Sequence, residues 1–253
     1  MEIKELARIV DTAAHLGQPI TQLSQNHHFS EADAYAIQAA SLQRRYDRGE
    51  QLIGLKMGFT SKAKMEQMGV NDLIWGRLTD AMLLANGGSL SLDRFIHPRA
   101  EPEICFLVNQ PIDRELSLEE TPNYVSAVAP ALEIIDSRYE NFKFSLEDVI
   151  ADNCSSAALV LGEWQLVPSS LDQLAISLEI DGQIVHLGSS SAILGNPWAS
   201  FQAATRLAAH YGQVIAKGAY IMAGAATPAV YLERGQSVAA NVERLGGVIL
   251  GVQ

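Results

Sequence analysis

Three glutamates provide the clearest chemical signal in the sequence. Glu101 and Glu103 are one residue apart at the start of an apolar run, and Glu133 lies inside a second apolar run. On an extended strand, residues i and i+2 face the same side, so the first two carboxylates would lie roughly 7 Å apart. Like charges at that distance repel each other, and a carboxylate in an apolar strand is costly without a partner. The pattern therefore indicates a divalent-cation site.

The ligand types favour a hard cation. Three carboxylates suit Mg²⁺ or Mn²⁺, and Mg²⁺ keeps open positions for water or substrate. The sequence has no CxxC motif and no suitably spaced histidine pair, which argues against a thiolate metal site. The same spacing also fits another interpretation, in which the E-x-E pair lies on a solvated face and Glu133 pairs with an arginine.

Lys56 is the candidate catalytic residue. It lies between Gly54 and Gly58 in an apolar run, and glycines permit the close approach of a ligand or a neighbouring backbone. A partly buried lysine can polarise a carbonyl or move a proton. The alternative is that its side chain simply extends to solvent.

Further polar residues are candidates for substrate contacts. Arg138 can hold a substrate carboxylate, or it can pair with Asp136. Ser155 and Ser156 belong to a polar patch between apolar segments, which can supply hydroxyl contacts to a ligand or form an ordinary polar turn. The sequence alone leaves both alternatives open.

The composition excludes several classes of protein. The chain has 253 residues, of which 48% are hydrophobic and 19% charged, a balance typical of a globular protein. The net charge of -11 disfavours nucleic acid as a partner. No membrane span and no signal peptide are recognisable. Cys105 and Cys154 are too few for a disulfide framework and are expected to be buried thiols, so a reducing cytoplasm fits.

Two helices are expected at the N-terminus. Apolar residues recur at helical spacing over residues 2–16. Ser30 has the character of an N-cap for a second helix that extends to about Arg48. We therefore expect a helical segment over residues 1–50, followed over residues 51–253 by the domain that carries the candidate site.

The rest of the chain predicts a mixture of strands and helices. Short apolar runs separated by glycine, asparagine and proline favour strands, and they continue from Ala219 to the end. Mixed strands with scattered helices argue for an α+β fold. The particular expectations are a helix over residues 117–128, a buried strand over 130–136, a hairpin over 172–186 with its turn at Asp181–Gly182, and a helix from Asn196 to about His210.

Four segments carry a resemblance to a known family. They read GLKMGFTSKAKMEQMGV, IHPRAEPEI, PALEIIDSRYENFKFSLEDVIADNCSS and LGSSSAILGNP. They resemble the hydratase/decarboxylase branch of the fumarylacetoacetate-hydrolase-like superfamily, and within it the decarboxylases that act on 2-oxo-3-hexenedioate. The resemblance covers nearly the whole chain. It implies a mixed β-sheet roll or barrel as the catalytic domain, and metal-dependent decarboxylation of a 2-oxo-enedioate in catechol meta-cleavage.

The resemblance also implies roles for particular residues. The family's metal-binding carboxylates correspond to Glu101, Glu103 and Glu133, and its active-site lysine corresponds to Lys56. The related 2-oxopent-4-enoate hydratases carry an acidic residue where this chain has Ile74, and an apolar residue there favours the decarboxylase. A hydratase with the same metal site remains the first alternative, and a non-catalytic partner subunit of a hydratase complex is the second. A homo-oligomer and association with such a hydratase are expected.

Overall fold

The computed structural model describes residues 2–61, 65 and 72–253. Residues 62–64 and 66–71 lie outside the described residues, and all of them except residue 71 belong to the first segment of the resemblance. Separate helices and two β-sheets make up the described part, which confirms the expected α+β class. No helix within it is long and apolar enough to cross a membrane.

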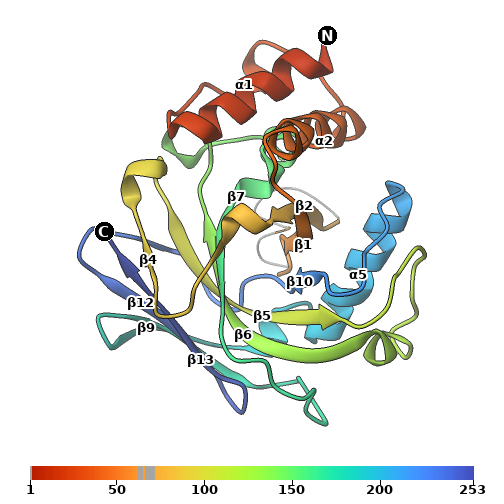
Figure 1. Ribbon diagram of the computed structural model, residues 1–253, viewed down its shortest axis with the longest axis vertical. Coiled ribbons are helices and arrows are strands. Elements are labelled where there is room, and N and C mark those ends of the chain that lie inside the picture. The colour runs from red at the N-terminus through yellow and green to blue at the C-terminus, as the bar shows by residue number, and fades with distance from the viewer. Residues whose placement is uncertain (1, 62–64, 66–71) are drawn as a thin grey trace.

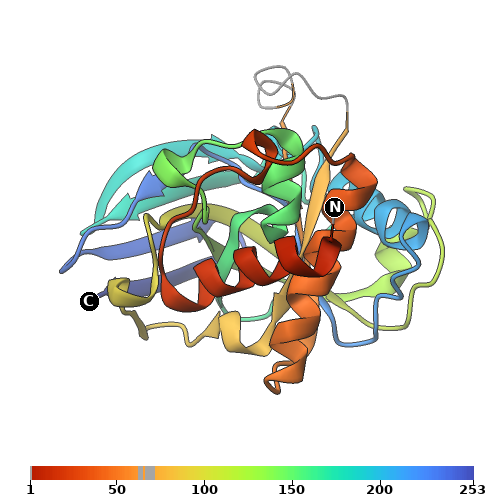
Figure 2. The same cartoon turned by 90° about the horizontal axis from the view of Figure 1, so that it is seen from above.

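The two N-terminal helices form as expected. Helix α1 spans Ile3–Leu16 and ends at Gly17, and helix α2 spans Glu31–Asp47 and begins with a capping box at Ser30. Asp11 of α1 is buried and pairs with Arg44 of α2 and with Arg48, the C-cap residue of α2, so the helices are joined by charge as well as by apolar packing. They lie alongside each other at one end of the molecule (Figures 1 and 2).

The larger sheet carries the candidate site. Its eight strands run in the order β2-β1-β10-β5-β6-β7-β3, with β11 paired to β5, and the sheet curls into a half-barrel (Figure 1). The long antiparallel pair β5–β6 forms its centre. The strands are β1 Leu52–Gly58, β2 Ile74–Thr79, β3 Leu83–Leu84, β5 Arg99–Val108, β6 Val125–Ile135, β7 Ser156–Leu161, β10 Tyr220–Met222 and β11 Val230–Tyr231.

A second sheet of five strands packs against the outer side of the first. Its order is β4-β13-β12-β8-β9, and an apolar cluster that includes Leu132, Leu178 and Val238 lies between the two sheets. The predicted hairpin is confirmed, with Asp181 and Gly182 both at positive φ in its turn. The strands are β4 Ser89–Leu90, β8 Ala175–Ile180, β9 Gln183–Ser189, β12 Ser237–Val242 and β13 Gly246–Val252.

Helix α5 spans Pro197–His210 as expected, and the Asn196 side chain caps its first turn. It packs on β5 through Phe201 and Phe106, so it supports the strand that carries the glutamates. The remaining helices are α4 Leu146–Ala151 and the 3₁₀ turns η1 Leu23–Gln25, η2 Asp80–Met82, η3 Leu92–Arg94, η4 Thr121–Tyr124, η5 Glu140–Phe142, η6 Asn153–Ser155 and η7 Ser190–Ala192.

The helix expected over residues 117–128 is wrong. A 3₁₀ turn occupies Thr121–Tyr124, and strand β6 begins directly after it at Val125. From there the chain pairs with β5 along its whole length. Strand formation depends on neighbouring strands that are distant in the sequence, so this pairing outweighs the local helical spacing.

Candidate active site

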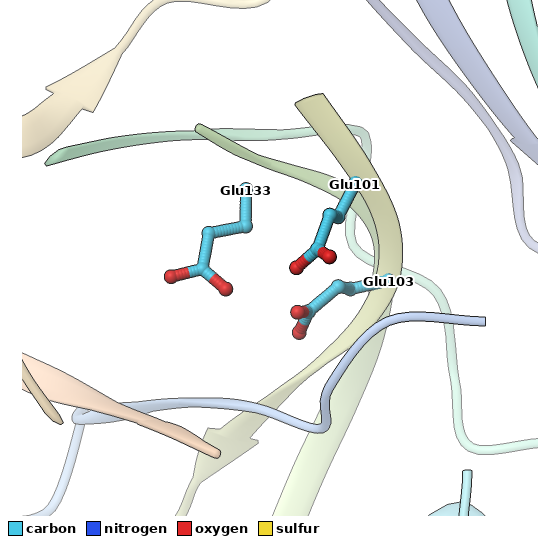
Figure 3. Close-up of side chains that lie close together, drawn as sticks. All are labelled: Glu101, Glu103 and Glu133. Atoms are coloured by element: carbon cyan, nitrogen blue, oxygen red, sulfur yellow. The ribbon is translucent and has the colours of Figure 1, made fainter. Parts of the chain in front are cut away.

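The three glutamates converge on one point. Glu101 on β5 lies directly opposite Glu133 on β6, and Glu103 follows two residues later on the same face. One carboxylate oxygen of each lies within 4.8 Å of the others, and the side chains point toward one another (Figure 3). All three residues are buried, which contradicts the alternative of a solvated face.

The carboxylates lack enough donors to compensate their burial. Glu103 accepts a hydrogen bond from the backbone N–H of Gly224 at 2.7 Å, but its other oxygen and Oε2 of Glu133 have no hydrogen-bond partner among the described residues. Burial and the neighbouring Glu133 raise the pKa of Glu103 well above its ordinary range, and burial also raises the pKa of Glu133. These orphaned oxygens fit a hard divalent cation, which would satisfy them and offset their repulsion.

Gly224 positions Glu103 and was not among the sequence candidates. Its φ of +102° lies in the region that favours glycine, and a Cβ atom there would lie 2.2 Å from Oγ1 of Thr60. The backbone N–H can therefore approach the carboxylate only if this residue has no side chain. The sequence shows a glycine among alanines at this place, but the requirement depends on tertiary contacts.

Lys56 lies beside the carboxylates on β1. Its Nζ atom is 3.0 Å from Oε1 of Glu133 and donates a hydrogen bond of 3.1 Å to the backbone oxygen of Cys154. Burial acts to lower the pKa of Lys56, but the carboxylate of Glu133 outweighs it and the pKa is raised. The side chain is buried, so the alternative of extension to solvent is wrong. Glu133 pairs with this lysine rather than with an arginine.

A left-handed turn brings polar groups to the lysine. Asn153, Cys154 and Ser155 all have φ between 50° and 59°, an uncommon run for residues with side chains. A Cβ atom on Gly76 would lie 2.6 Å from the Asn153 oxygen, so the neighbouring strand needs a glycine to accommodate this turn. The turn aims the Cys154 oxygen at Lys56. Such local strain is typical of functional sites.

The two serine candidates have different surroundings. Ser155 lines the cavity described below, and its hydroxyl is buried without a hydrogen-bond partner in the described part of the chain. Ser156 faces a different cavity, and its hydroxyl donates to the backbone oxygen of Asn153. The substrate-binding role therefore stays a prediction that placement favours for Ser155 alone.

One cavity joins these residues. It has a volume of about 730 Å³, and Lys56, Glu101 and Ser155 lie on its wall. Much of the remaining lining is apolar, and Ile74, which is 3% exposed, belongs to it. An apolar cavity with a few convergent polar groups is the usual form of a small-molecule site. The further apolar lining residues include Phe59, Phe142, Phe144, Val149 and Ile135.

The placement of Arg138 does not support its predicted substrate contact. The residue is buried outside this cavity and lines a separate one of about 280 Å³. Its guanidinium pairs with Asp152 and donates to the backbone oxygens of Asp152 and Ser156. The expected pairing with Asp136 is also wrong, because the carboxylate of Asp136 accepts two backbone N–H groups instead.

Comparison with curated proteins finds close relatives of the whole chain. A 4-oxalocrotonate decarboxylase from Pseudomonas sp is 47% identical over 248 residues, which cover 98% of this chain and 97% of that protein. A 2-keto-4-pentenoate hydratase from Paraburkholderia xenovorans (strain LB400) is 31% identical over 97% of this chain and 93% of that protein. No family model matches the chain.

Comparison with solved structures agrees. The 4-oxalocrotonate decarboxylase from Pseudomonas putida G7, complexed with magnesium and adipate, superposes with a TM-score of 0.95 at 34% identity, covering 99% of this chain and 97% of that one. A fumarylpyruvate hydrolase from Pseudomonas aeruginosa, complexed with Mn²⁺ and pyruvate, gives a TM-score of 0.61 at 14% identity over 79% of this chain and 88% of that one. The second match shows the fumarylacetoacetate-hydrolase-like fold alone, and it confirms the expected fold.

Proposed function

This chain belongs to the 4-oxalocrotonate decarboxylase family, and we propose that it is a carboxy-lyase of the catechol meta-cleavage route. It converts 2-oxo-3-hexenedioate (4-oxalocrotonate) into 2-hydroxypenta-2,4-dienoate and CO₂, and the dienol then tautomerises to 2-oxopent-4-enoate. The reaction depends on a divalent metal. The observation that carries the proposal is the convergence of three buried carboxylates beside a cavity of substrate size. Oxygens of Glu103 and Glu133 have no hydrogen-bond partner among the described residues.

The metal role of the carboxylates rests on their chemistry. Glu101, Glu103 and Glu133 supply only oxygen ligands, which suit Mg²⁺ or Mn²⁺, and a structural relative binds magnesium. When bound, the ion would act as a Lewis acid for the negative charge that develops on the 2-oxygen of the substrate. The carboxylates are ligands rather than proton donors, since all of them face the cation position.

Lys56 would stabilise the negative charge that develops on the 2-oxygen of the substrate. As the bond between C5 and C6 breaks, the electron pair moves through the conjugated system to the 2-oxygen, and C6 leaves as CO₂. The charged ammonium of Lys56 lies next to Glu133 and lines the cavity, so it can donate a hydrogen bond to that oxygen. The substrate carries its own electron sink, and no organic cofactor is required.

Ile74 favours decarboxylation over hydration. Its side chain is an apolar part of the cavity wall and cannot activate a water molecule. The hydroxyl of Ser155, which has no partner among the described residues, can accept or donate one hydrogen bond to the substrate. The higher identity to the decarboxylases than to the hydratases agrees with this assignment.

Product analysis tests the proposal directly. Purified protein with Mg²⁺ and 2-oxo-3-hexenedioate should release CO₂ and accumulate 2-hydroxypenta-2,4-dienoate, which is followed by its ultraviolet absorbance. Excess EDTA should abolish the reaction, and added Mg²⁺ should restore it. A protein that hydrates the dienoate but leaves the diacid intact is a hydratase. One that does neither, yet co-purifies with a hydratase, is a non-catalytic partner subunit.

The partners proposed for this chain are a small 2-oxo-enedioate, further copies of the chain and a 2-oxopent-4-enoate hydratase. Relatives of both enzyme types align with nearly the whole chain, so the two proteins would share a fold and could assemble through equivalent surfaces. Light scattering of the protein alone, and then with the hydratase, measures both associations. A cytoplasmic location is proposed because both cysteines are unpaired and buried, as a reducing compartment permits.

A further inference from the structure

Arg99 faces the same cavity as the metal-site residues. It lies on β5 two residues before Glu101, so the two side chains project from the same face of the strand. It lines the 730 Å³ cavity together with Glu101 and Lys56. Arg138 was the sequence candidate for holding a substrate carboxylate, but that residue lines a separate cavity and its guanidinium pairs with Asp152.

The guanidinium of Arg99 lies against two aromatic rings. Its Cζ atom lies 3.9 Å from the ring centre of Phe142 and 4.1 Å from that of Tyr231, and it donates a hydrogen bond to the Tyr231 hydroxyl. Contacts with two rings restrain the guanidinium and leave its Nε–H group for a further ligand. A carboxylate is such a ligand, since it can accept two parallel hydrogen bonds from a guanidinium.

This arginine has no carboxylate partner in the described residues. None of the ion pairs there involves it, and its Nε atom is buried without a hydrogen-bond partner. A buried donor without a partner costs free energy, so a guanidinium in this state is incomplete. The missing partner is an anion that the cavity admits.

The segment that carries Phe142 to Arg99 has a strained backbone. Asn141 and Phe142 have φ of 58° and 56°, and a positive φ is an outlier for a bulky residue such as phenylalanine. The short antiparallel pairing of β11 with β5 places Tyr231 directly opposite Arg99 on the neighbouring strand. Strain that persists at a ligand-facing position is a sign of function. Here the strained backbone conformation places the ring of Phe142 against the guanidinium.

We propose that Arg99 binds the carboxylate of the diacid substrate that lies farther from the metal site, and so selects dicarboxylates over monocarboxylates. This inference rests on the proposed function. The Cα atoms of Arg99 and Glu101 are two residues apart along β5, roughly 7 Å by strand rise. The two carboxylates of an extended six-carbon diacid are separated by five carbon–carbon bonds of about 1.5 Å each, which is a comparable span. A diacid with one end at the glutamates therefore reaches Arg99 with the other.

The chemistry determines which kinetic constant Arg99 affects. The distal carboxylate is charged in the ground state and leaves as neutral CO₂, so its attraction to Arg99 weakens as the reaction proceeds. An interaction that is stronger with the substrate than with the transition state lowers KM without raising kcat. Arg99→Gln should therefore raise KM for 2-oxo-3-hexenedioate about 10- to 100-fold, the range for a lost charged hydrogen-bond pair, and leave kcat undiminished.

Binding of two matched inert acids tests the assignment independently of turnover. Adipate and hexanoate have the same chain length and differ in the second carboxylate. Calorimetry on the Mg²⁺-loaded protein should show tighter binding of adipate. Arg99→Gln should weaken adipate about 10- to 100-fold and leave hexanoate unchanged, while Arg99→Lys, which keeps the charge without the fork, should lie between. Arg234→Gln, at an exposed arginine paired with Asp93, is the matched control and should change neither.

The outcomes separate this proposal from the proposed function. If Arg99→Gln leaves the adipate affinity unchanged, or weakens adipate and hexanoate equally, Arg99 does not read the distal carboxylate and the inference is wrong. An intact hexanoate affinity in the variant shows that the fold and the metal site survive. Failure of the CO₂ assay with a normal adipate preference would instead contradict the decarboxylase assignment alone.

Discussion

Two buried charge clusters lie a short distance apart in this molecule and differ in how completely they are satisfied. The first comprises Glu101, Glu103 and Glu133 with Lys56. Among the described residues its carboxylates outnumber its cations, and one oxygen each of Glu103 and Glu133 lacks a partner. The second is the pair of Arg138 and Asp152, in which one cation meets one anion and the guanidinium also binds two backbone oxygens. Both are almost inaccessible to solvent.

This difference in hydrogen-bond and ion-pair partners distinguishes a ligand-binding site from an ion pair that only stabilises the fold. The pair of Arg138 and Asp152 fixes the chain that leaves β6 against the turn at residues 152–156, and its two charges already compensate each other. A cluster whose described carboxylates outnumber its described cations, and which has unpartnered oxygens, is stable only if something else completes it. Burial alone does not distinguish the two, whereas the hydrogen-bond inventory does.

The largest effect is expected from Glu103→Gln. The amide keeps the shape but removes one ligand charge, so Mg²⁺ binding should be lost and CO₂ release should fall by at least about four orders of magnitude, since the Lewis acid contributes several kcal/mol. Stability in the absence of metal should not fall, because one of three mutually repelling buried charges is gone. Calorimetry with Mg²⁺, the CO₂ assay and thermal unfolding measure the three quantities. Full activity in this variant would remove the metal assignment.

Arg138→Leu should have the opposite effect, with a loss of stability and no loss of Mg²⁺ binding. It leaves the buried carboxylate of Asp152 without compensation and should lower the free energy of unfolding by about 3–5 kcal/mol. The protein that remains folded should bind Mg²⁺ with unchanged affinity, because Arg138 does not line the metal-site cavity. Urea denaturation and Mg²⁺ calorimetry test the two halves. Loss of Mg²⁺ affinity without loss of stability would make the comparison between the clusters untenable.

The glutamate cluster was predictable because it depends on local rules. Period-2 alternation places Glu101 and Glu103 on one face, and an acidic residue in an apolar strand requires a partner whatever the fold. The same period also places Arg99 on that face. The sequence therefore contained this signal, but Arg138 was considered as the substrate-binding arginine instead. Arg138 follows Glu133 by only five residues, yet β6 ends at Ile135 and the chain turns away, which no local pattern indicates.

Other features depended on contacts between distant segments. The requirement for glycine at residue 224 arises from Thr60, more than 160 residues earlier, and the left-handed turn at residues 153–155 is accommodated by Gly76. The strand that replaced the expected helix after Tyr124 exists because β5 pairs with it. Sequence therefore predicted which residue types could form the candidate site, and the tertiary fold decided which of them meet.

Asp152 should give the structural cluster its own pH dependence. Burial raises the pKa of Asp152 to about 6 from an ordinary value of 3.8, although Arg138 opposes the shift. Between these values the folded protein binds more protons than the unfolded chain, so the contribution of Asp152 to stability is present below about pH 4 and is lost as the pH rises through 6. Relative to Asp152→Asn, the wild type should lose on the order of 2–3 kcal/mol of unfolding free energy from pH 4 to 7. Denaturation curves at each pH measure this difference, and a parallel pH profile for the two proteins would contradict it.

The smallest effects concern adjacent serines that divide in the same way as the clusters. Ser155→Ala removes an orphaned hydroxyl from the cavity wall, so stability should be unchanged or slightly higher and KM for the diacid should rise about 3- to 10-fold, the value of one neutral hydrogen bond. Ser156→Ala removes a hydroxyl that already donates to the Asn153 oxygen, so it should lower stability by about 1 kcal/mol and leave KM unchanged. Steady-state kinetics and urea denaturation on both variants complete the test. If the two variants behaved alike, hydrogen-bond satisfaction would not be what separates binding groups from structural ones in this protein.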